Sequence, residues 1–253
     1  MITKEAVIVT VRTSSKRLPN KAIMEIKPGI KSIDIVIKRA KKIGSTVILA
    51  TSNDVSDDIL VQIAKQHKIE VFRGALLNKI KRLYDCFVEY QIERAVIIEA
   101  DDIAFDYTIN QKAITELRQT DSDMIMYPPE IVTGLFLLVL KKNALEKLYS
   151  VVPDENTNTD VSIIELIKET DLNISQLKLE PYAKNKKIRL TLDYPEDLKF
   201  FQELYNNIDT TSSGKTIIDF CEKNKSITEI NFYRQKDYLD NQKKKSVSKK
   251  NGR

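Results

Sequence analysis

With 253 residues, the chain is long enough to form a core that is stable without disulfides or bound metals. Its two cysteines, Cys86 and Cys221, lack metal-ligand spacing, and no apolar run is long enough for a signal peptide or a bilayer span, so we expect a cytoplasmic protein with reduced thiols. The net charge of +5 excludes little by itself, because six cations and no acids fall in residues 243–253 and leave a net charge of −1 for the rest.

Apolar, β-branched runs alternate with helical patterns along the first half of the chain. The runs cover residues 6–11, 46–51, 70–72, 95–100 and 123–127, and the helical patterns cover residues 32–42, 57–67, 76–90 and 108–119. Continuously apolar runs, such as the first, are typical of strands that are buried on both faces of a parallel sheet. The alternation predicts an α/β fold with an open, doubly wound, mostly parallel, Rossmann-like sheet, which binds ligands outside the carboxyl ends of its strands.

The second half of the chain is less regular and ends in a basic segment. Its patterns predict strands at 135–140 and 186–192 and helices at 141–152, 159–170, 195–207 and 214–224. We interpret residues 241–253 as a disordered basic tail. Because a nucleic-acid-binding domain is expected to carry a basic face of its own, the sequence predicts no specific nucleic-acid partner. Weak docking of the tail on an anionic membrane or nucleic acid is an alternative.

The loop after the first apolar run, residues 11–21, groups four cations around three small polar residues. Small residues let backbone N–H groups approach phosphate oxygens, while arginine and lysine side chains neutralise the phosphate charge. The loop has neither a P-loop nor a G-x-G-x-x-G pattern, and the chain has only six glycines. The loop therefore predicts phosphate binding without a glycine cradle.

The same loop resembles the nucleotide loop of cytidylyltransferases of the spore-coat polysaccharide type, relatives of the enzymes that make CMP-activated 3-deoxy-manno-octulosonate and acylneuraminate. Their pattern is A-R-x-G-S-x-R-L-P-x-K, and the matching residues are Arg12, Ser15, Arg17, Leu18, Pro19 and Lys21. Ser14 replaces the glycine, which would be costly if that position needed a positive φ.

Four further segments, 48–58, 71–86, 99–107 and 189–200, are similar to segments of the same family and follow in the same order. The resemblance implies the GT-A type of sheet found in nucleotide-diphospho-sugar transferases and a single nucleotidyltransferase domain over residues 1–240. Its expected parts are a nucleotide-binding half (1–125), an acceptor and dimerisation half (126–210) and a helical segment (211–240). Relatives often form homodimers, so we expect one here.

The resemblance also implies a Mg²⁺ site formed by Asp101 and Asp193, which follow two predicted strands that lie far apart in the sequence. Mg²⁺ held by one or two carboxylates cancels the repulsion between a triphosphate and an anionic acceptor. Each residue has a structural alternative. Asp101 suits a turn, and Asp193 and Glu196 have the spacing of a capping box.

The expected site residues follow from the loop and the matched segments. Nucleotide-binding residues are expected to be Arg12, Ser14, Ser15, Arg17, Lys21, Ser52 and Arg73, and catalytic residues are expected to be Arg12, Arg17, Lys21 and Asp101. For Ser52 and Arg73, a role in closing a turn remains an equal alternative.

The acceptor segment departs from the family pattern. Phe136 and Leu138 replace acids of the family, and with strand alternation they would share one face of the strand at 135–140. We expect a Mg²⁺-dependent transfer of CMP from CTP to a changed, small anionic acceptor, such as a sugar acid for surface-polysaccharide synthesis. The alternatives are a glycosyltransferase that uses the Asp101-Asp102 pair and a non-catalytic nucleotide-binding homologue.

Overall fold

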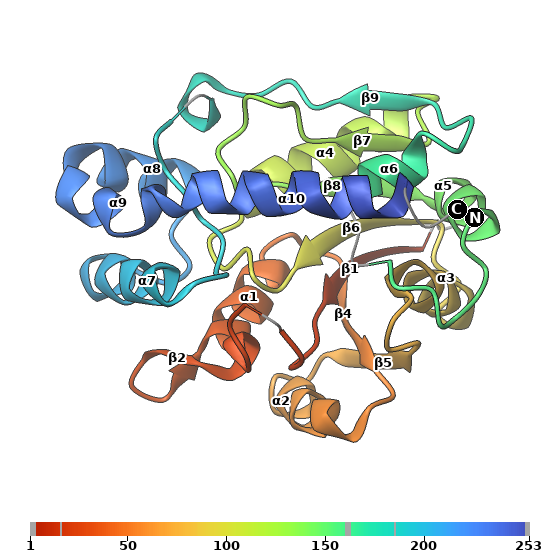
Figure 1. The fold of residues 1–253 in the computed structure, drawn as a ribbon, viewed down its shortest axis with the longest axis horizontal. Helices are drawn as coiled ribbons and strands as arrows, with labels where there is room; N and C mark the ends of the chain where they lie inside the picture. Colours follow the sequence, from red (N-terminus) through yellow and green to blue (C-terminus); the bar gives the residue numbers. More distant parts are fainter. Residues whose placement is uncertain (1–3, 16, 160–162, 185, 251–253) are drawn as a thin grey trace.

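The computed structural model describes residues 4–15, 17–159, 163–184 and 186–250, and within them seven strands form one sheet in the order β5-β4-β1-β6-β8-β7-β9 (Figure 1). The strands are β1 (Glu5–Thr10), β4 (Thr46–Ser52), β5 (Glu70–Gly74), β6 (Arg94–Glu99), β7 (Met124–Met126), β8 (Leu138–Lys141) and β9 (Ile174–Gln176). The first four of these in the sheet order pair in parallel, and β8 is antiparallel to both of its neighbours. A small hairpin, β2 (Glu25–Lys27) and β3 (Ile30–Lys31), lies outside this sheet. The prediction of a mostly parallel α/β sheet is confirmed.

Helices cover both faces of the sheet because its central strands are apolar on both sides. Along β1, Val7 and Val9 belong to one buried cluster, and Ala6 and Ile8 belong to the other. The first cluster includes residues of α1 (Ser32–Lys41), α2 (Asp58–Gln66), α4 (Tyr107–Gln119), α7 (Pro195–Asn207) and α8 (Gly214–Lys223). The second includes residues of α3 (Lys79–Glu89), α5 (Lys142–Ser150) and α6 (Ile163–Ile167). This is the doubly wound arrangement that alternating strands and helices predict.

Two elements of the second half differ from the prediction. The apolar residues at 186–192 do not form a strand: Arg189 makes only an isolated bridge with Thr133, and Leu192 N–H donates to the carbonyl of Asp101. The helix predicted at 159–170 is the short α6, and residues 160–162 lie outside the described part of the chain. Residues 186–192 are thus held by individual backbone hydrogen bonds, including one of 2.9 Å from Leu190 N–H to the Thr133 carbonyl, rather than by regular strand pairing.

The described part of the chain ends in two helices, α9 (Lys225–Phe232) and α10 (Arg234–Lys250). Both begin inside the helical segment expected at 211–240, and α10 continues through residues 241–250, which are expected to belong to the basic tail. Lysine is a good helix former, and the start of α10 is held by two hydrogen bonds of 3.0 Å from Arg234 to Glu196. Asn241 adds a hydrogen bond of 3.0 Å to the Tyr194 hydroxyl. None of the helices within the described residues is long and apolar enough to cross a membrane.

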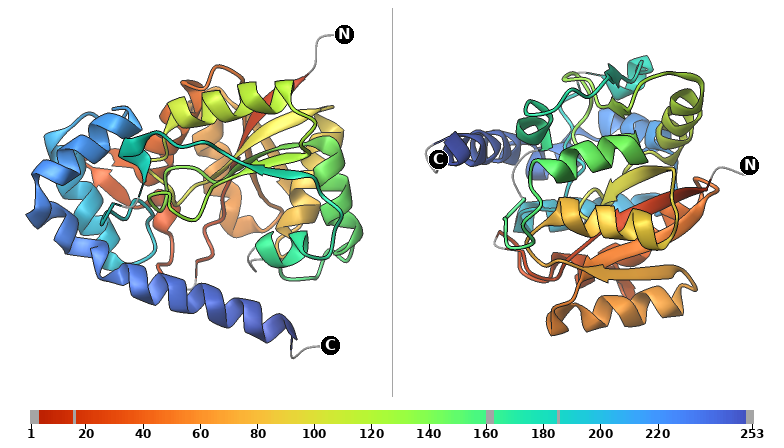
Figure 2. Two further views of the ribbon diagram at one scale, coloured as in Figure 1. Left: turned by 90° about the horizontal axis from the view of Figure 1, so that it is seen from above. Right: turned by 90° about the vertical axis from the view of Figure 1, so that its right-hand side faces the viewer.

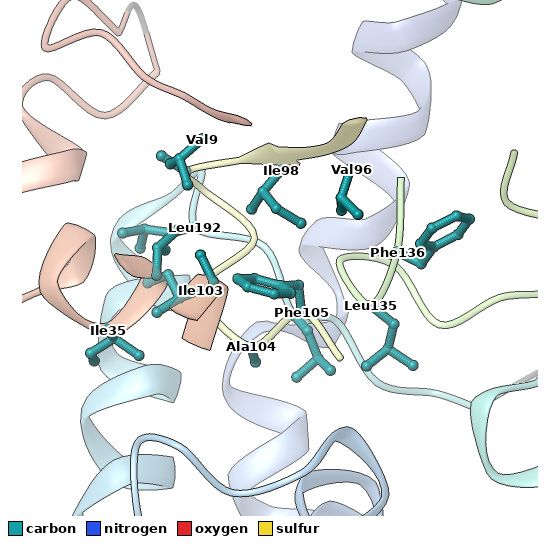
Figure 3. Close-up of a cluster of buried hydrophobic side chains, with 14 of the residues drawn as sticks. Val9, Ile35, Val96, Ile98, Ile103, Ala104, Phe105, Leu135, Phe136 and Leu192 are labelled. Atoms are coloured by element: carbon teal, nitrogen blue, oxygen red, sulfur yellow. The ribbon is translucent and has the colours of Figure 1, made fainter. Parts of the chain in front are cut away.

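A cluster of buried side chains lies beneath the segment that follows β6 (Figure 3). Ile103 and Phe105 lie within three residues after Asp102, and Leu192 comes directly before Asp193; all three are at most 1 % exposed. Burying a side chain of this size stabilises the fold by about 1.5–3 kcal/mol. The core therefore fixes the two chain segments that carry the predicted metal ligands.

Candidate active site

A cleft of about 1260 Å³ lies where β1 and β6 end. The loop after β1, the segment after β6, the start of α3 and one side of α10 contribute to its walls. In Figure 2, α10 runs along the outside of the molecule, across the side on which these strands end. The cleft thus lies at the carboxyl ends of the strands, where the fold class predicts ligand binding.

Two cations of the loop meet the two predicted metal ligands inside this cleft. The Lys21 ammonium lies 2.6 Å from Asp101 Oδ2 and 2.8 Å from Asp193 Oδ1. Arg17 Nη2 lies 2.5 Å from the same oxygen of Asp193. Arg17 and Lys21 therefore form one charged cluster with Asp101 and with Asp193, which lies more than 170 positions away from both cations in the chain.

Burial and charge shift the pKa values of these groups in opposite directions. Burial by itself would raise the pKa of Asp193, but Lys21 and Arg17 outweigh it and hold this pKa well below its usual range. Burial raises the pKa of Asp101, and the carboxylates of Asp193 and Glu99 raise it further, against the effect of Lys21. Burial and the Asp101 carboxylate also raise the pKa of Asp102 well above its usual range. Asp101 and Asp102 therefore have less compensating positive charge nearby than Asp193 has.

Asp193 does not cap α7, contrary to the capping alternative. The N-cap is Tyr194, whose N–H donates to Asp197 Oδ2 at 3.0 Å, and the N–H of Asp193 donates to the same oxygen at 2.8 Å. Arg189, which is fully buried, donates two hydrogen bonds to Asp197 and one of 3.4 Å to Asp193. The capping box thus starts at Tyr194 rather than Asp193, and Asp197 rather than Glu196 is its acid. The Asp193 carboxylate faces the cleft instead.

The loop after β1 is held in place by Asp57, a buried residue that sequence reasoning missed. Asp57 Oδ1 accepts hydrogen bonds from the backbone N–H and the hydroxyl of Thr13, at 2.8 and 2.7 Å. Its other oxygen accepts from the hydroxyls of Thr51 and Ser52. Burial would raise the pKa of Asp57, but these hydrogen bonds lower it. Asp57 therefore ties the end of β4 to the predicted phosphate loop.

The remaining predicted residues divide into two groups. Arg12, Ser14 and Ser15 line the cleft, and Arg12 Nη1 donates to the carbonyl of Leu76 at 2.6 Å. Ser14 is not among the described non-glycine residues with positive φ, so its replacement of glycine carries no backbone strain. Ser52 and Arg73 are not among the described residues that line the cleft. 

Both have structural contacts instead. Ser52 is fully buried against Asp57, and Arg73 donates to the backbone carbonyls of Ser52 and Asp54 and pairs with Asp58 at 2.6 Å. These contacts correspond to the turn-closing alternative for the two residues.

Functional candidates that the sequence analysis missed lie beside the cluster. Lys79 pairs with Glu99 at 2.6 Å inside the cleft, and Tyr238 of α10 lines the cleft close to the carboxylates. The i, i+4 spacing of Arg189, Asp193 and Asp197 was a usable signal for their network. Tyr238 lies in the helical segment expected at 211–240, and no pattern there marked it as a site residue.

The donor set fits Mg²⁺. No group of three His, Cys, Asp or Glu side chains within the described residues could hold a metal ion. Mg²⁺ usually takes one or two carboxylates and completes its shell with water and substrate phosphates. Asp101 and Asp193 supply two oxygens that already converge on one cation, the Lys21 ammonium. They are the residues that would hold the ion.

The altered acceptor segment is built differently from the prediction. Residues 134–137 precede β8, and Phe136 and Leu138 do not share a strand face: Phe136 packs in the cluster with Val9, and Leu138 packs in the cluster with Ile8. Gly134 has φ of +88°, and a Cβ there would lie 2.3 Å from the carbonyl oxygen of Leu190. This close approach turns the chain and breaks the alternation that the prediction assumed.

Comparisons with known proteins show which family the chain resembles. A family model described as cytidylyltransferase matches residues 6–244. An uncharacterised protein of Methanocaldococcus jannaschii is 30 % identical over 240 residues, which are 92 % of this chain and 97 % of that protein.

Two solved structures share the fold. A cytidylyltransferase from Leptospira borgpetersenii has a TM-score of 0.78 at 22 % identity, covering 89 % of this chain and 97 % of that one. A CMP:2-keto-3-deoxy-manno-octonic acid synthetase complexed with CTP has a TM-score of 0.62 at 14 % identity, covering 81 % of this chain and 99 % of that one.

Proposed function

Because the chain belongs to the cytidylyltransferase family and is a nucleotidyltransferase, we propose that it transfers CMP from CTP to a small anionic acceptor and releases pyrophosphate, with Mg²⁺ as its cofactor. The observation that carries the proposal is the meeting of Arg17, Lys21, Asp101 and Asp193 in one cleft. A sugar acid destined for surface polysaccharide is the acceptor class that the family resemblance favours.

The loop residues would bind the triphosphate. Arg12, Arg17 and Lys21 line the cleft and supply positive charge to the β- and γ-phosphates, while Ser14 and Ser15 allow backbone N–H groups to approach. These cations would stabilise the negative charge that collects on the departing pyrophosphate. Asp57 would keep the loop in the required position through Thr13.

The two aspartates would organise the reacting centre. When bound by Asp101 and Asp193, Mg²⁺ would supply charge neutralisation at the α-phosphate and lower the pKa of an acceptor hydroxyl. The Lys21 ammonium now occupies the position between the two carboxylates. Its release from them would free Lys21 to contact phosphate.

Pyrophosphate release tests the proposal. Each of the four NTPs is incubated with Mg²⁺ and a panel of sugar acids, and we expect release that is selective for CTP. Asp101→Asn should reduce the rate at least 100-fold, in line with the loss of one electrostatic group at a reacting centre. Asp58→Asn, which alters an exposed ion pair outside the cleft, should keep the wild-type rate.

The same assay separates the alternatives. Transfer from a nucleotide-sugar without pyrophosphate release would identify a glycosyltransferase that uses Asp101 and Asp102. Binding of CTP without turnover on every acceptor would identify a non-catalytic homologue.

A further inference from the structure

Two phenol groups and one carboxylate line the cleft near the charged cluster. They are Tyr127, which follows β7, Tyr238 on α10, and Asp102. Burial and then Asp102 raise the pKa of both tyrosines, which places these three side chains within electrostatic reach of one another. Both phenols therefore stay protonated and available as hydrogen-bond donors.

Neither phenol hydroxyl has a hydrogen-bond partner among the protein groups that the structure describes. Both tyrosines are half-buried, and neither hydroxyl is among the fully buried atoms without a partner, so these hydroxyls are open to the cleft. By contrast, Tyr182 donates to Asp106 at 2.7 Å, and the fully buried Tyr205 donates to the carbonyl of Ile103 at 3.3 Å. Two donors that face the same cleft without a protein partner can both bind a ligand there.

The side chains of α10 hold Tyr238 in this position. Its ring lies 4.9 Å from the Arg189 guanidinium, which is itself fixed by Asp197 and Asp193. One turn earlier, Gln235 accepts from Arg189 at 3.2 Å and donates to the Thr133 hydroxyl at 2.9 Å. The helix is thus attached to the network that carries a predicted metal ligand, so Tyr238 lies next to the reacting centre.

The chemistry of the three groups selects a class of ligand. The tyrosines donate, and the Asp102 carboxyl group keeps an oxygen that accepts whether or not it is ionised. An isolated carboxylate or phosphate would accept from the tyrosines but would be repelled by Asp101, Asp102 and Asp193. Neighbouring hydroxyls on one small molecule both donate and accept, and they satisfy all three groups without adding negative charge.

We infer that Tyr127, Tyr238 and Asp102 form the acceptor subsite and that they bind adjacent hydroxyl groups of a polyhydroxylated acceptor. The inference rests on the proposed function and specifies how the acceptor binds. The anionic group of the acceptor would point away from Tyr127, Tyr238 and Asp102, and α10 would form one wall of the acceptor subsite. Tyr238 is a substrate-binding residue.

The test removes one hydroxyl at a time. Tyr238→Phe and Tyr127→Phe are compared with wild type in two measurements, CTP binding by calorimetry and pyrophosphate release against the concentration of each acceptor in a panel of sugar acids, neutral sugars and simple alkyl alcohols. Tyr233→Phe is the matched control, because Tyr233 is 58 % exposed and lies outside the cleft lining.

We expect each cleft variant to raise the KM for the hydroxyl-rich acceptor about 3- to 10-fold, the effect of losing one neutral hydrogen bond. The Kd for CTP should remain within about twofold of wild type, since the nucleotide cations are unchanged, and Tyr233→Phe should match wild type in both measurements. Turnover should require an acceptor with neighbouring hydroxyls.

Three outcomes would overturn the inference. One is an unchanged KM in both cleft variants of an active enzyme; another is efficient turnover of a simple alkyl alcohol. The third is CTP binding with neither turnover nor saturation-transfer NMR signals from any hydroxyl-rich member of the panel. Absence of CTP binding in the wild-type protein would instead reject the proposed function itself.

Discussion

At the scale of single residues, Lys21 neutralises charge on the two carboxylates of the site, Asp101 and Asp193. Its side chain is 15 % exposed, and its ammonium contacts both Asp101 and Asp193, whose charges outweigh burial and raise the pKa of Lys21. Without this cation, two carboxylates would face each other in a partly buried cleft. Breaking a buried ion pair by removing one partner typically costs about 3–5 kcal/mol.

The variant Lys21→Met is therefore expected to lower the free energy of unfolding by about 3 kcal/mol in the absence of divalent cations. Mg²⁺ should raise its Tm more than it raises that of the wild-type protein, because the ion replaces the missing charge. Thermal unfolding with and without MgCl₂ measures both effects. Lys215→Met removes a cation from an exposed pair and should change neither quantity; equal Mg²⁺ shifts in Lys21→Met and wild type would contradict the account.

The sequence was most informative about residues that carry charge in a recognisable order. Arg12, Arg17, Lys21, Asp101 and Asp193 could be grouped because strand ends meet at one edge of a sheet and because they match a family pattern. Asp57 could not be identified in this way. Its role depends on hydrogen bonds to Thr13 and Ser52, and any aspartate near a helix start has the same appearance in the sequence.

At the scale of elements, the turn before β8 shapes one wall of the cleft. Gly134 brings the chain so close to Leu190 that a side chain would collide with backbone atoms. The contact also explains why regular alternation fails at residues 134–137. Periodicity describes strands and helices, but it cannot anticipate one glycine that redirects the chain.

Gly134→Ala should therefore lower the free energy of unfolding by about 3 kcal/mol or more, since it adds a backbone collision to an unfavourable φ. Gly44→Ala is the control: its φ of +95° is equally unfavourable, but no atom lies within 4 Å of the added Cβ. The control should cost about 1–2 kcal/mol. Urea unfolding gives both values, and equal losses would show that the contact with Leu190 is unimportant.

Amino-acid composition alone does not predict the full length of helix α10. Its start lies in the expected helical segment, where Arg234 contacts Glu196. Its lysine-rich end, whose composition favours disorder, begins where Asn241 contacts Tyr194. The contacts that order it are made across the molecule and are invisible in the local sequence.

At the scale of the whole molecule, the buried carboxylates act on stability in opposite directions. Asp193 has a lowered pKa, so its ionised form stabilises the folded protein above about pH 4, and this contribution is lost as the pH falls towards its folded-state pKa. Asp102 has a raised pKa, so its ionised form destabilises the folded protein at neutral pH, and that cost disappears below about pH 4.

Asparagine substitutions should therefore have opposite signs at pH 7. Asp102→Asn is expected to raise Tm by about 2–4 °C, and Asp193→Asn is expected to lower it by at least as much. Both differences should shrink as the pH is lowered to about 3. Calorimetric Tm values from pH 3 to 8 measure this, and a destabilised Asp102→Asn protein at pH 7 would contradict the assigned charge balance.

The most direct test of the central claim, that the loop after β1 and the two remote aspartates form one nucleotide site, is a calorimetric double-mutant cycle. CTP is titrated in the presence of Mg²⁺ into the wild-type protein, Arg12→Met, Asp193→Asn and the double variant. We predict that wild type binds CTP, that each single variant binds it at least 10-fold more weakly, and that the two effects are not additive, because both groups act on one triphosphate. Absence of CTP binding by the wild-type protein, or unchanged affinity in both single variants, would contradict the account.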